Sequence, residues 1–192
     1  MRVQRLAIPE VALIQPRRFA DVRGFFSETF KADAFADAIG ATVFVQDNEA
    51  QSHAAGTVRG LHFQRPPAAQ GKLVRVTRGA VLDAVVDVRT GSPSFGAVVS
   101  VRLDAEDGAQ LWVPPGFAHG YCTLLADTVV AYKVTSPYSP ADEGGLLWSD
   151  PALAVPWPVS PDKAIVSDKD RALPTLAAMP PAFGYEPDHA PR

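Results

Sequence analysis

The sequence predicts one all-β domain, a sandwich or barrel of antiparallel strands, in a chain of 192 residues. Short runs of apolar and β-branched residues follow one another from residue 42 to residue 134. Turns rich in Gly, Pro and Asp separate these runs. No long helical patterns alternate with them, and neither GxGxxG nor a P-loop motif occurs, so parallel folds that bind nucleotide cofactors are disfavoured.

Composition excludes several protein classes. With 47% hydrophobic and 20% charged residues, the chain can bury a core, which excludes disorder as its main state. A net charge of −3 predicts neither nucleic-acid nor membrane partners. A single cysteine, Cys122, excludes an internal disulfide, and the N-terminus lacks the apolar core of a signal peptide. We therefore expect a cytoplasmic protein.

The individual elements follow from periodicity. Residues 31–40 have a helical pattern, with Phe35 on the apolar face and Gly40 at the C-terminal cap, which predicts one short helix. Tyr132 shares strand parity with Val130 and Val134, so its side chain is expected to be enclosed. The predicted strands are residues 42–48, 57–63, 72–76, 80–88, 97–103, 110–113 and 128–134.

The strand at 80–88 has two different faces. Leu82, Ala84, Val86 and Val88 form a wholly apolar face, which predicts that this side is the core. The other face combines Asp83 and Asp87 with two valines, and we expect it to be wet or catalytic.

The final quarter of the chain is rich in proline. Nine of the 18 prolines follow Asp150, so this part cannot form a central strand and is predicted to run extended across the domain surface. Trp148 and Trp157 are expected to anchor it to the sheet, and residues 181–192 are expected to be loosely held.

Two histidines have spacings with chemical meaning. His119 completes a Gly108–Pro114–Gly116–His119 pattern, and His62 follows Gly56 and precedes Gln64. These segments resemble the two motifs that line the bowl of a cupin, a double-stranded β-helix or jelly roll. A metal-binding cupin offers a second histidine at the position of Gln64 and then a glutamate, so no metal is predicted and both histidines are free for acid–base chemistry.

Further motifs occur in a fixed order between about residue 3 and residue 177: FADVRGFFSETF, VQDN, RGLHFQ, QGKLVRV, FGAVVSVRL, LWVPPGFAHG, YKVTSPY, LLWSDP and SDKDRALP. On these motifs the chain closely resembles the dTDP-4-dehydrorhamnose 3,5-epimerase family. The resemblance implies an all-β cupin jelly roll with a few short helices, an extended Pro-rich C-terminal segment and no cofactor. It implies one domain, 1–192, made of a dimer-exchange and ligand segment at about 1–40, the jelly roll at about 41–150 and the SDKD segment at about 151–192.

The same resemblance implies the chemical roles. His62 is the proton acceptor, Asp170 orients its imidazole, Tyr132 donates a proton on the other face of the sugar, and Lys72 lies near the C4 oxygen. The implied substrate is a dTDP-linked 4-keto-6-deoxyhexose, and the implied assembly is a homodimer in which Arg23 and Glu28 complete the partner's site. The residues placed around the ligand are Arg23, Phe26, Glu28, Gln46, Asp47, Asn48, Arg59, Lys72, His119, Tyr138, Glu143 and Lys169.

The sequence leaves three details of the site open. Arg59 has the opposite strand parity to His62, which predicts a local bulge or contact with a different part of the ligand. Asp83 is either a satisfied buried carboxylate or a partner of His62 or His119. Family members often carry a second tyrosine where Pro137 stands and a serine where Ala50 stands, so base stacking rests on Tyr138.

The predicted reaction converts dTDP-4-dehydro-6-deoxy-D-glucose to dTDP-4-dehydro-L-rhamnose by inverting C3 and C5. The main alternative is a related epimerase that inverts only C3 or C5 of a modified deoxysugar. A metal-dependent cupin oxygenase and a non-catalytic sugar-nucleotide binding module are the alternatives from other classes, which Gln64 and the catalytic set respectively disfavour.

Overall fold

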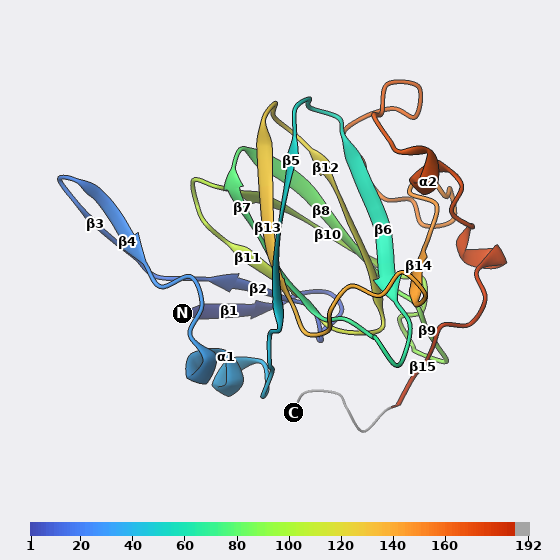
Figure 1. Cartoon of the computed structure of the whole chain (residues 1–192), viewed down its shortest axis with the longest axis horizontal. Coiled ribbons are helices and arrows are strands. Elements are labelled where there is room, and N and C mark those ends of the chain that lie inside the picture. The colour runs from blue at the N-terminus through green and yellow to red at the C-terminus, as the bar shows by residue number, and fades with distance from the viewer. Residues whose placement is uncertain (187–192) are drawn as a thin grey trace.

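Two antiparallel sheets pack face to face in the computed structural model, which describes residues 1–186 (Figure 1). The six-stranded sheet has the order β1 (Arg2–Arg5), β2 (Ala12–Gln15), β11 (Gln110–Val113), β7 (Lys72–Arg78), β13 (Thr128–Val134) and β5 (Gln46–Ser52). The five-stranded sheet has the order β10 (Val98–Asp104), β8 (Ala80–Asp87), β12 (Phe117–Thr123), β6 (Val58–Gln64) and β14 (Glu143–Gly145). The predicted all-β jelly roll is confirmed.

The strand predictions were accurate where the chain alternates clearly and failed elsewhere. Strands β6, β7, β8, β10, β11 and β13 lie within two residues of their expected bounds, whereas the run at 42–48 forms a strand only from Gln46. Strand β12 was missed because FAHGYCT contains a glycine and a histidine and lies next to a Pro–Gly turn. All seven of its residues are buried between β8 and β6, so sheet packing determines this strand.

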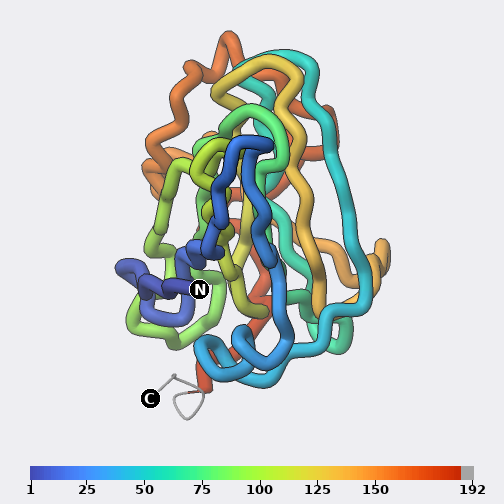
Figure 2. Tube along the Cα trace, turned by 90° about the vertical axis from the view of Figure 1, so that its left-hand side faces the viewer, coloured from blue at the N-terminus to red at the C-terminus, as the bar shows by residue number. Residues whose placement is uncertain are grey.

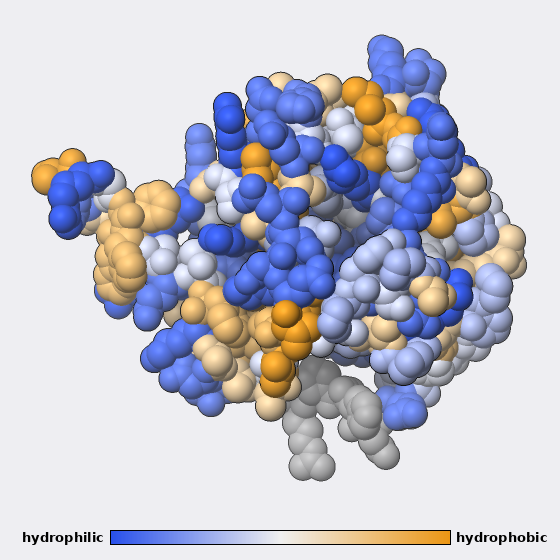
Figure 3. Space-filling view, in the orientation of Figure 1, coloured by the Kyte–Doolittle hydropathy of each residue, from blue (hydrophilic) through white to orange (hydrophobic). Residues whose placement is uncertain are grey.

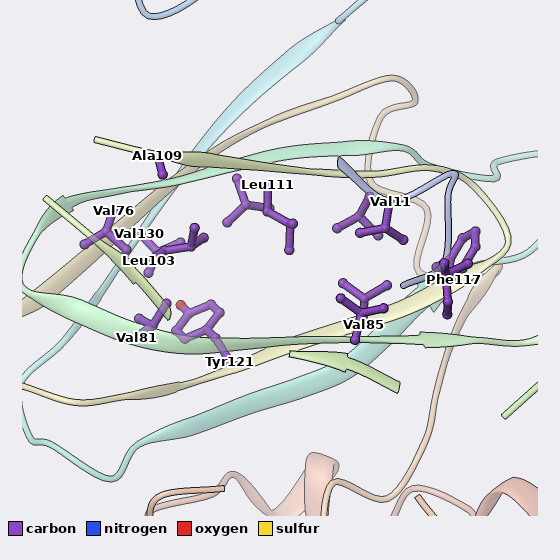
Figure 4. Packing of buried hydrophobic residues seen from close by; sticks show 14 residues of the cluster. Val11, Val76, Val81, Val85, Leu103, Ala109, Leu111, Phe117, Tyr121 and Val130 are labelled. Carbon is purple, nitrogen blue, oxygen red and sulfur yellow. The ribbon is translucent and has the colours of Figure 1, made fainter. Parts of the chain in front are cut away.

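The main core lies between the two sheets. Val81, Val85 and Tyr121 from the five-stranded sheet face Leu111 and Val130 from the six-stranded sheet (Figure 4). This arrangement corrects the expectation for the mixed face of β8. That face points into the sandwich, and its two carboxylates, Asp83 and Asp87, are fully buried rather than wet.

A second apolar layer covers the outside of the five-stranded sheet. Ala84, Val86 and Val88 pack there against Leu153 and Phe183 of the C-terminal segment. The apolar face of β8 is therefore buried as expected, but under the extended segment rather than in the central core. Sequence parity cannot distinguish the two cases, because both faces of the strand are buried.

The C-terminal segment runs extended along this sheet, as predicted (Figure 1). Trp157 donates a hydrogen bond from Nε1 to the carbonyl of Trp148 at 2.7 Å, which fixes the segment at its start. Near its end, β15 (Phe183–Gly184) pairs in parallel with β9 (Arg89–Thr90), so these residues are not loosely held. The rest of that prediction, for residues 187–192, lies outside the described residues.

The N-terminal region forms a projecting hairpin. Strands β3 (Arg18–Asp21) and β4 (Gly24–Ser27) pair only with each other. Figures 1 and 3 show them standing away from the sandwich, and Figure 2 shows the hairpin, in blue, in front of it. Arg18 anchors the base of this hairpin, because its guanidinium donates hydrogen bonds to the carbonyls of Ala105 and Glu106. The tip carries exposed apolar side chains, including Val22 and Phe25. No helix in residues 1–186 is long and apolar enough to span a membrane.

Helix α1 (Ala32–Ala38) packs through Phe35 on the outer face of the six-stranded sheet, where it meets Leu73 and Trp112, and this packing leads to a stability prediction. Phe35 is 2% exposed, and its ring contacts Phe44 and Trp112 at centroid distances of 5.5 and 5.4 Å. Replacing Phe35 with alanine leaves a cavity, so we expect a loss of about 3–5 kcal/mol in the free energy of unfolding. Denaturant titration checks this value, and a loss below about 1 kcal/mol would show that the helix is not part of the cooperative core.

Candidate active site

A cavity of about 530 Å³ lies where the C-terminal segment crosses the open end of the jelly roll. Its walls come from both sheets and from the segment that precedes and includes α2 (Asp168–Arg171). The polar side chains that line it are Thr57, Arg59, His62, Lys72, His119, Tyr121, Tyr132, Ser167, Lys169 and Asp170. Most of the residues expected to carry chemistry therefore line one cavity.

His62 and Asp170 form a hydrogen-bonded pair in this cavity. His62 Nε2 lies 2.7 Å from Asp170 Oδ1, and the backbone N–H of Gly60 donates to Asp170 Oδ2 at 3.1 Å. Burial by itself raises the pKa of Asp170, but these hydrogen bonds and the nearby imidazole outweigh it and hold the pKa below its usual range. Asp170 is therefore ionised and accepts the Nε2 proton, which leaves Nδ1 of His62 free to accept another proton.

Local structure places Asp170 accurately. The Ser167 hydroxyl caps α2 by accepting a hydrogen bond from the backbone N–H of Asp170 at 3.1 Å. This cap fixes the start of the short helix under strand β6. The SDKD sequence therefore combines a helix-capping serine with the carboxylate that the cap positions.

A bulge brings Arg59 and His62 to the same cavity. His119 pairs with His62, but Tyr121 pairs with Arg59, so the register between β12 and β6 shifts within this short interval. Gly60 has a φ of +111°, and a Cβ on it would lie 2.7 Å from the carbonyl oxygen of His119, so only glycine fits. The predicted bulge is confirmed, and it reconciles the opposite strand parity of the two side chains.

Tyr132 and Lys72 approach the cavity from the six-stranded sheet. Burial raises the pKa of Tyr132, an effect that the positive charge of Arg59 partly opposes. Burial also lowers the pKa of Lys72 to about 8, while the charges of Asp83 and Glu143 act in the opposite direction. At neutral pH, Tyr132 is therefore protonated and Lys72 is still mostly a cation. Tyr132 is partly buried, as its parity predicted.

The lowered pKa of Lys72 leads to a prediction about how kcat/KM depends on pH. If protonated Lys72 is required, kcat/KM falls as pH rises through about 8, because kcat/KM reports ionisations of the free enzyme. The charged groups that act on its ammonium are Asp83 and Glu143, and its nitrogen donates to the carbonyl of His62 at 3.3 Å. Asp83→Asn removes a charge that raises the Lys72 pKa, so the alkaline limb should move to lower pH. An unmoved limb would show that another group titrates there.

His119 and Asp83 form a second, more deeply buried pair. His119 Nε2 lies 2.9 Å from Asp83 Oδ2, and both side chains are buried between the sheets. The structure thus settles the question left open for Asp83: it is the partner of His119, not of His62. His119 lines the cavity, and its ring is held by the carboxylate behind it.

A smaller hollow of about 150 Å³ lies next to the cavity and shares His62, Lys72 and Tyr132 with it. Glu143 links its rim to the C-terminal segment, because it accepts hydrogen bonds from Lys169 Nζ at 2.5 Å and Tyr138 Oη at 2.9 Å. Both contacts lower the pKa of Glu143 despite its partial burial. The other predicted ligand residues that line this hollow are Gln46, Asn48, Tyr138 and Glu143.

Comparison with known proteins decides the family. A family model described as dTDP-4-dehydrorhamnose 3,5-epimerase matches residues 5–178 of this chain. This chain belongs to that family. A dTDP-4-dehydrorhamnose 3,5-epimerase of Sinorhizobium fredii (strain NBRC 101917 / NGR234) is 54% identical over 96% of this chain and 94% of its own length.

Two further relatives show which activities are named among proteins similar to this chain. The crystal structure of dTDP-6-deoxy-D-glucose-3,5-epimerase from Legionella pneumophila Philadelphia 1, in complex with dTDP-4-keto-L-rhamnose, has a TM-score of 0.92 and 40% identity. It covers 96% of this chain and 98% of that chain. A dTDP-4-dehydrorhamnose 3-epimerase of Streptomyces niveus is 36% identical over 90% of this chain and 84% of its own length. The family's fold therefore also carries enzymes named for a single inversion.

Four of the residues that family resemblance placed around the ligand lie elsewhere in this structure. Arg23, Phe26 and Glu28 lie in or just after the projecting hairpin, and Arg23 pairs with Asp21 of the same hairpin. Asp47 points away from the cavity on β5 and pairs with Lys133 Nζ at 2.9 Å. Successive side chains on a strand point to opposite faces. Because Gln46 and Asn48 face the hollow, Asp47 between them points away from it.

Sequence reasoning missed three polar residues of the cavity wall, Thr57, Tyr121 and Ser167, and for Tyr121 the sequence held a signal. Tyr121 follows His119 by two residues, so on a strand the two side chains point to the same face. The signal was present in the sequence, but residues 117–123 had to be recognised as a strand before it could be used.

Proposed function

We propose that this chain is a dTDP-4-dehydrorhamnose 3,5-epimerase that converts dTDP-4-dehydro-6-deoxy-D-glucose to dTDP-4-dehydro-L-rhamnose. One observation carries the residue assignment: the His62–Asp170 pair and Tyr132 line the same cavity from opposite sheets. A base and an acid that approach from opposite sides are what inversion of a carbon centre requires. Lys72 lines the same cavity and supplies a positive charge there.

The proposed steps use only groups of this chain. Nδ1 of His62 removes the proton from the carbon next to the C4 ketone, and Asp170 stabilises the imidazolium through Nε2. The electron pair moves onto the C4 oxygen, where the Lys72 ammonium stabilises the enolate. Tyr132 then donates its proton to the opposite face of the carbon, which inverts it. Proton exchange with solvent restores both side chains, and the same steps act at C3 and at C5.

The polar side chains of the cavity wall that take no part in proton transfer are proposed to bind the nucleotide. Arg59, His119 and Lys169 line the cavity and offer donors to a diphosphate. The exposed Tyr138 ring at the rim is the proposed stacking surface for the base. Residues 1–40 are proposed to act in a homodimer, where the hairpin brings Arg23, Phe26 and Glu28 to the partner's site. A cytoplasmic location stays a prediction.

Proton NMR in deuterated water tests the proposal directly. Purified protein is mixed with the 4-keto substrate without added metal, and deuterium incorporation is followed at C3 and C5 together with the appearance of the L-rhamno product. Incorporation at both carbons with product formation is the expected result. No incorporation at either carbon would defeat the proposal.

A second candidate is an epimerase that inverts only one carbon. This candidate is considered because a dTDP-4-dehydrorhamnose 3-epimerase of Streptomyces niveus matches most of this chain. Incorporation of deuterium at C3 or C5 alone in the same NMR experiment would select this candidate. The relative at 54% identity, named for both inversions, favours the first.

A further inference from the structure

Behind the wall of the cavity, two buried polar atoms have no hydrogen-bond partner within residues 1–186: the hydroxyl of Tyr121 and Oδ1 of Asp83. Both belong to side chains that are at least 95% buried, since Tyr121 is 5% exposed and Asp83 is 0% exposed. Leaving such groups unpaired inside a protein costs more than a hydrogen bond contributes, so a native structure normally satisfies them.

The two residues that carry these unpaired atoms are neighbours in the sheet. Tyr121 on β12 and Asp83 on β8 are direct cross-strand partners, so their side chains leave the sheet on the same face. Figure 4 shows the Tyr121 hydroxyl pointing into the interior between the sheets. The charge of Asp83 acts on the Tyr121 hydroxyl and contributes to raising its pKa to about 12, mainly a result of burial. The hydroxyl therefore keeps its proton at neutral pH, and it belongs to the cross-strand partner of the carboxylate whose Oδ1 lacks a donor.

We propose that a buried water bridges the Tyr121 hydroxyl and Asp83 Oδ1, and that Tyr121 is thereby a positioning residue for the Asp83–His119 pair. A polar site of this kind suits a single water, which needs two or more polar partners to be held inside a protein. The water supplies Oδ1 with a donor, while Oδ2 keeps its bond to His119 Nε2 at 2.9 Å. With both oxygens held, the carboxylate cannot rotate away from the imidazole.

The inferred consequence concerns binding more than proton transfer, and it rests on the proposed function. Tyr121 is part of the cavity wall, but its hydroxyl oxygen is buried, so the hydroxyl itself does not touch the ligand. It acts through Asp83 on His119, which lines the cavity as a proposed donor to the diphosphate. Loss of the hydroxyl should therefore raise KM for the nucleotide sugar and Kd for dTDP by about five- to tenfold, the effect of about one hydrogen bond, with kcat changed less than twofold.

The first experiment is a high-resolution crystal structure of the wild-type protein. The expected result is a density peak within hydrogen-bonding distance of both Tyr121 Oη and Asp83 Oδ1, which disappears or moves in Tyr121→Phe. An empty site, or a direct contact between the two atoms, overturns the water bridge. This readout does not depend on activity, so it remains decisive even if the epimerase proposal fails.

The second experiment is a double-mutant cycle on dTDP affinity measured by calorimetry. If Tyr121 acts through Asp83, the effects of Tyr121→Phe and Asp83→Asn are not additive, because the second change removes the group that the first one served. Additive effects, or a Tyr121→Phe variant with wild-type Kd and KM, would refute the positioning role. Tyr185→Phe is the matched control, since its ring packs on Arg89 outside the cavity and its dTDP affinity should stay unchanged.

Discussion

Replacing His62 with alanine is expected to lower deuterium incorporation at C3 and C5 by about a thousandfold, within the range that a general base contributes. The structure provides the reason. His62 pairs with Asp170 through Nε2 at 2.7 Å, so the imidazole is oriented by a buried carboxylate and its Nδ1 remains available as the base. The measurement is the initial rate of incorporation by proton NMR, with saturating substrate.

A matched control separates chemistry from folding. His53 is also paired with a carboxylate, Asp127, at 3.3 Å, but this pair is exposed and does not line the cavity. His53→Ala should therefore retain wild-type rates. Asp170→Asn should fall between the two variants, because it keeps the imidazole but removes the charge that stabilises the imidazolium. If His62→Ala keeps more than about a tenth of the wild-type rate while it is folded, His62 is not the base.

Replacing Tyr132 with phenylalanine is expected to separate two signals that move together in the wild-type protein. Product formation should fall by about a hundredfold or more, because the proton for the opposite face of the carbon is lost. Deuterium incorporation into the starting sugar should fall much less, since His62 can still remove a proton and return a deuteron on its own face. Both rates come from one NMR time course.

The positions of His62 and Tyr132 in the cavity wall support this expected difference between the two rates. His62 belongs to β6 of the five-stranded sheet, whereas Tyr132 belongs to β13 of the six-stranded sheet, so the two groups reach the cavity from different sides. Equal losses in both rates would show that Tyr132 is needed for proton removal or binding rather than as the acid on the opposite face. Tyr185→Phe again provides a control that removes a tyrosine hydroxyl outside the cavity.

Several features of the site were predictable because they are local or follow from strand alternation. Tyr132 was expected to be enclosed from its parity with Val130 and Val134, and it is partly buried beside the cavity. The conflict in parity between Arg59 and His62 predicted a bulge, and Gly60 provides it. Such inferences succeed because neighbouring side chains on a strand are constrained by the backbone alone.

Other features of the fold and of the site could not be predicted from local sequence patterns. Strand β12 has no clear alternation and forms because β6 and β8 lie on either side of it. The two faces of β8 are both buried, one between the sheets and one under the C-terminal segment, so neither identifies the core. The direction of Asp47 also depended on which face of β5 meets the cavity, and this is set by the pairing of β5 with β13, where Asp47 lies opposite Lys133.

The sequence by itself determined that the chain is an all-β domain, which residue types are available for acid–base chemistry, and that a proline-rich segment crosses the surface, because each follows from local pattern and composition. Family resemblance already assigned Asp170 to His62, but only the tertiary structure decided that Asp83 serves His119. Asp170 reaches His62 across 108 positions of the chain and Asp83 reaches His119 across 36. Pairs so far apart are set by how strands pair and segments pack, and the same strand pairing places Tyr121 and Asp83 side by side on the inner face of one sheet.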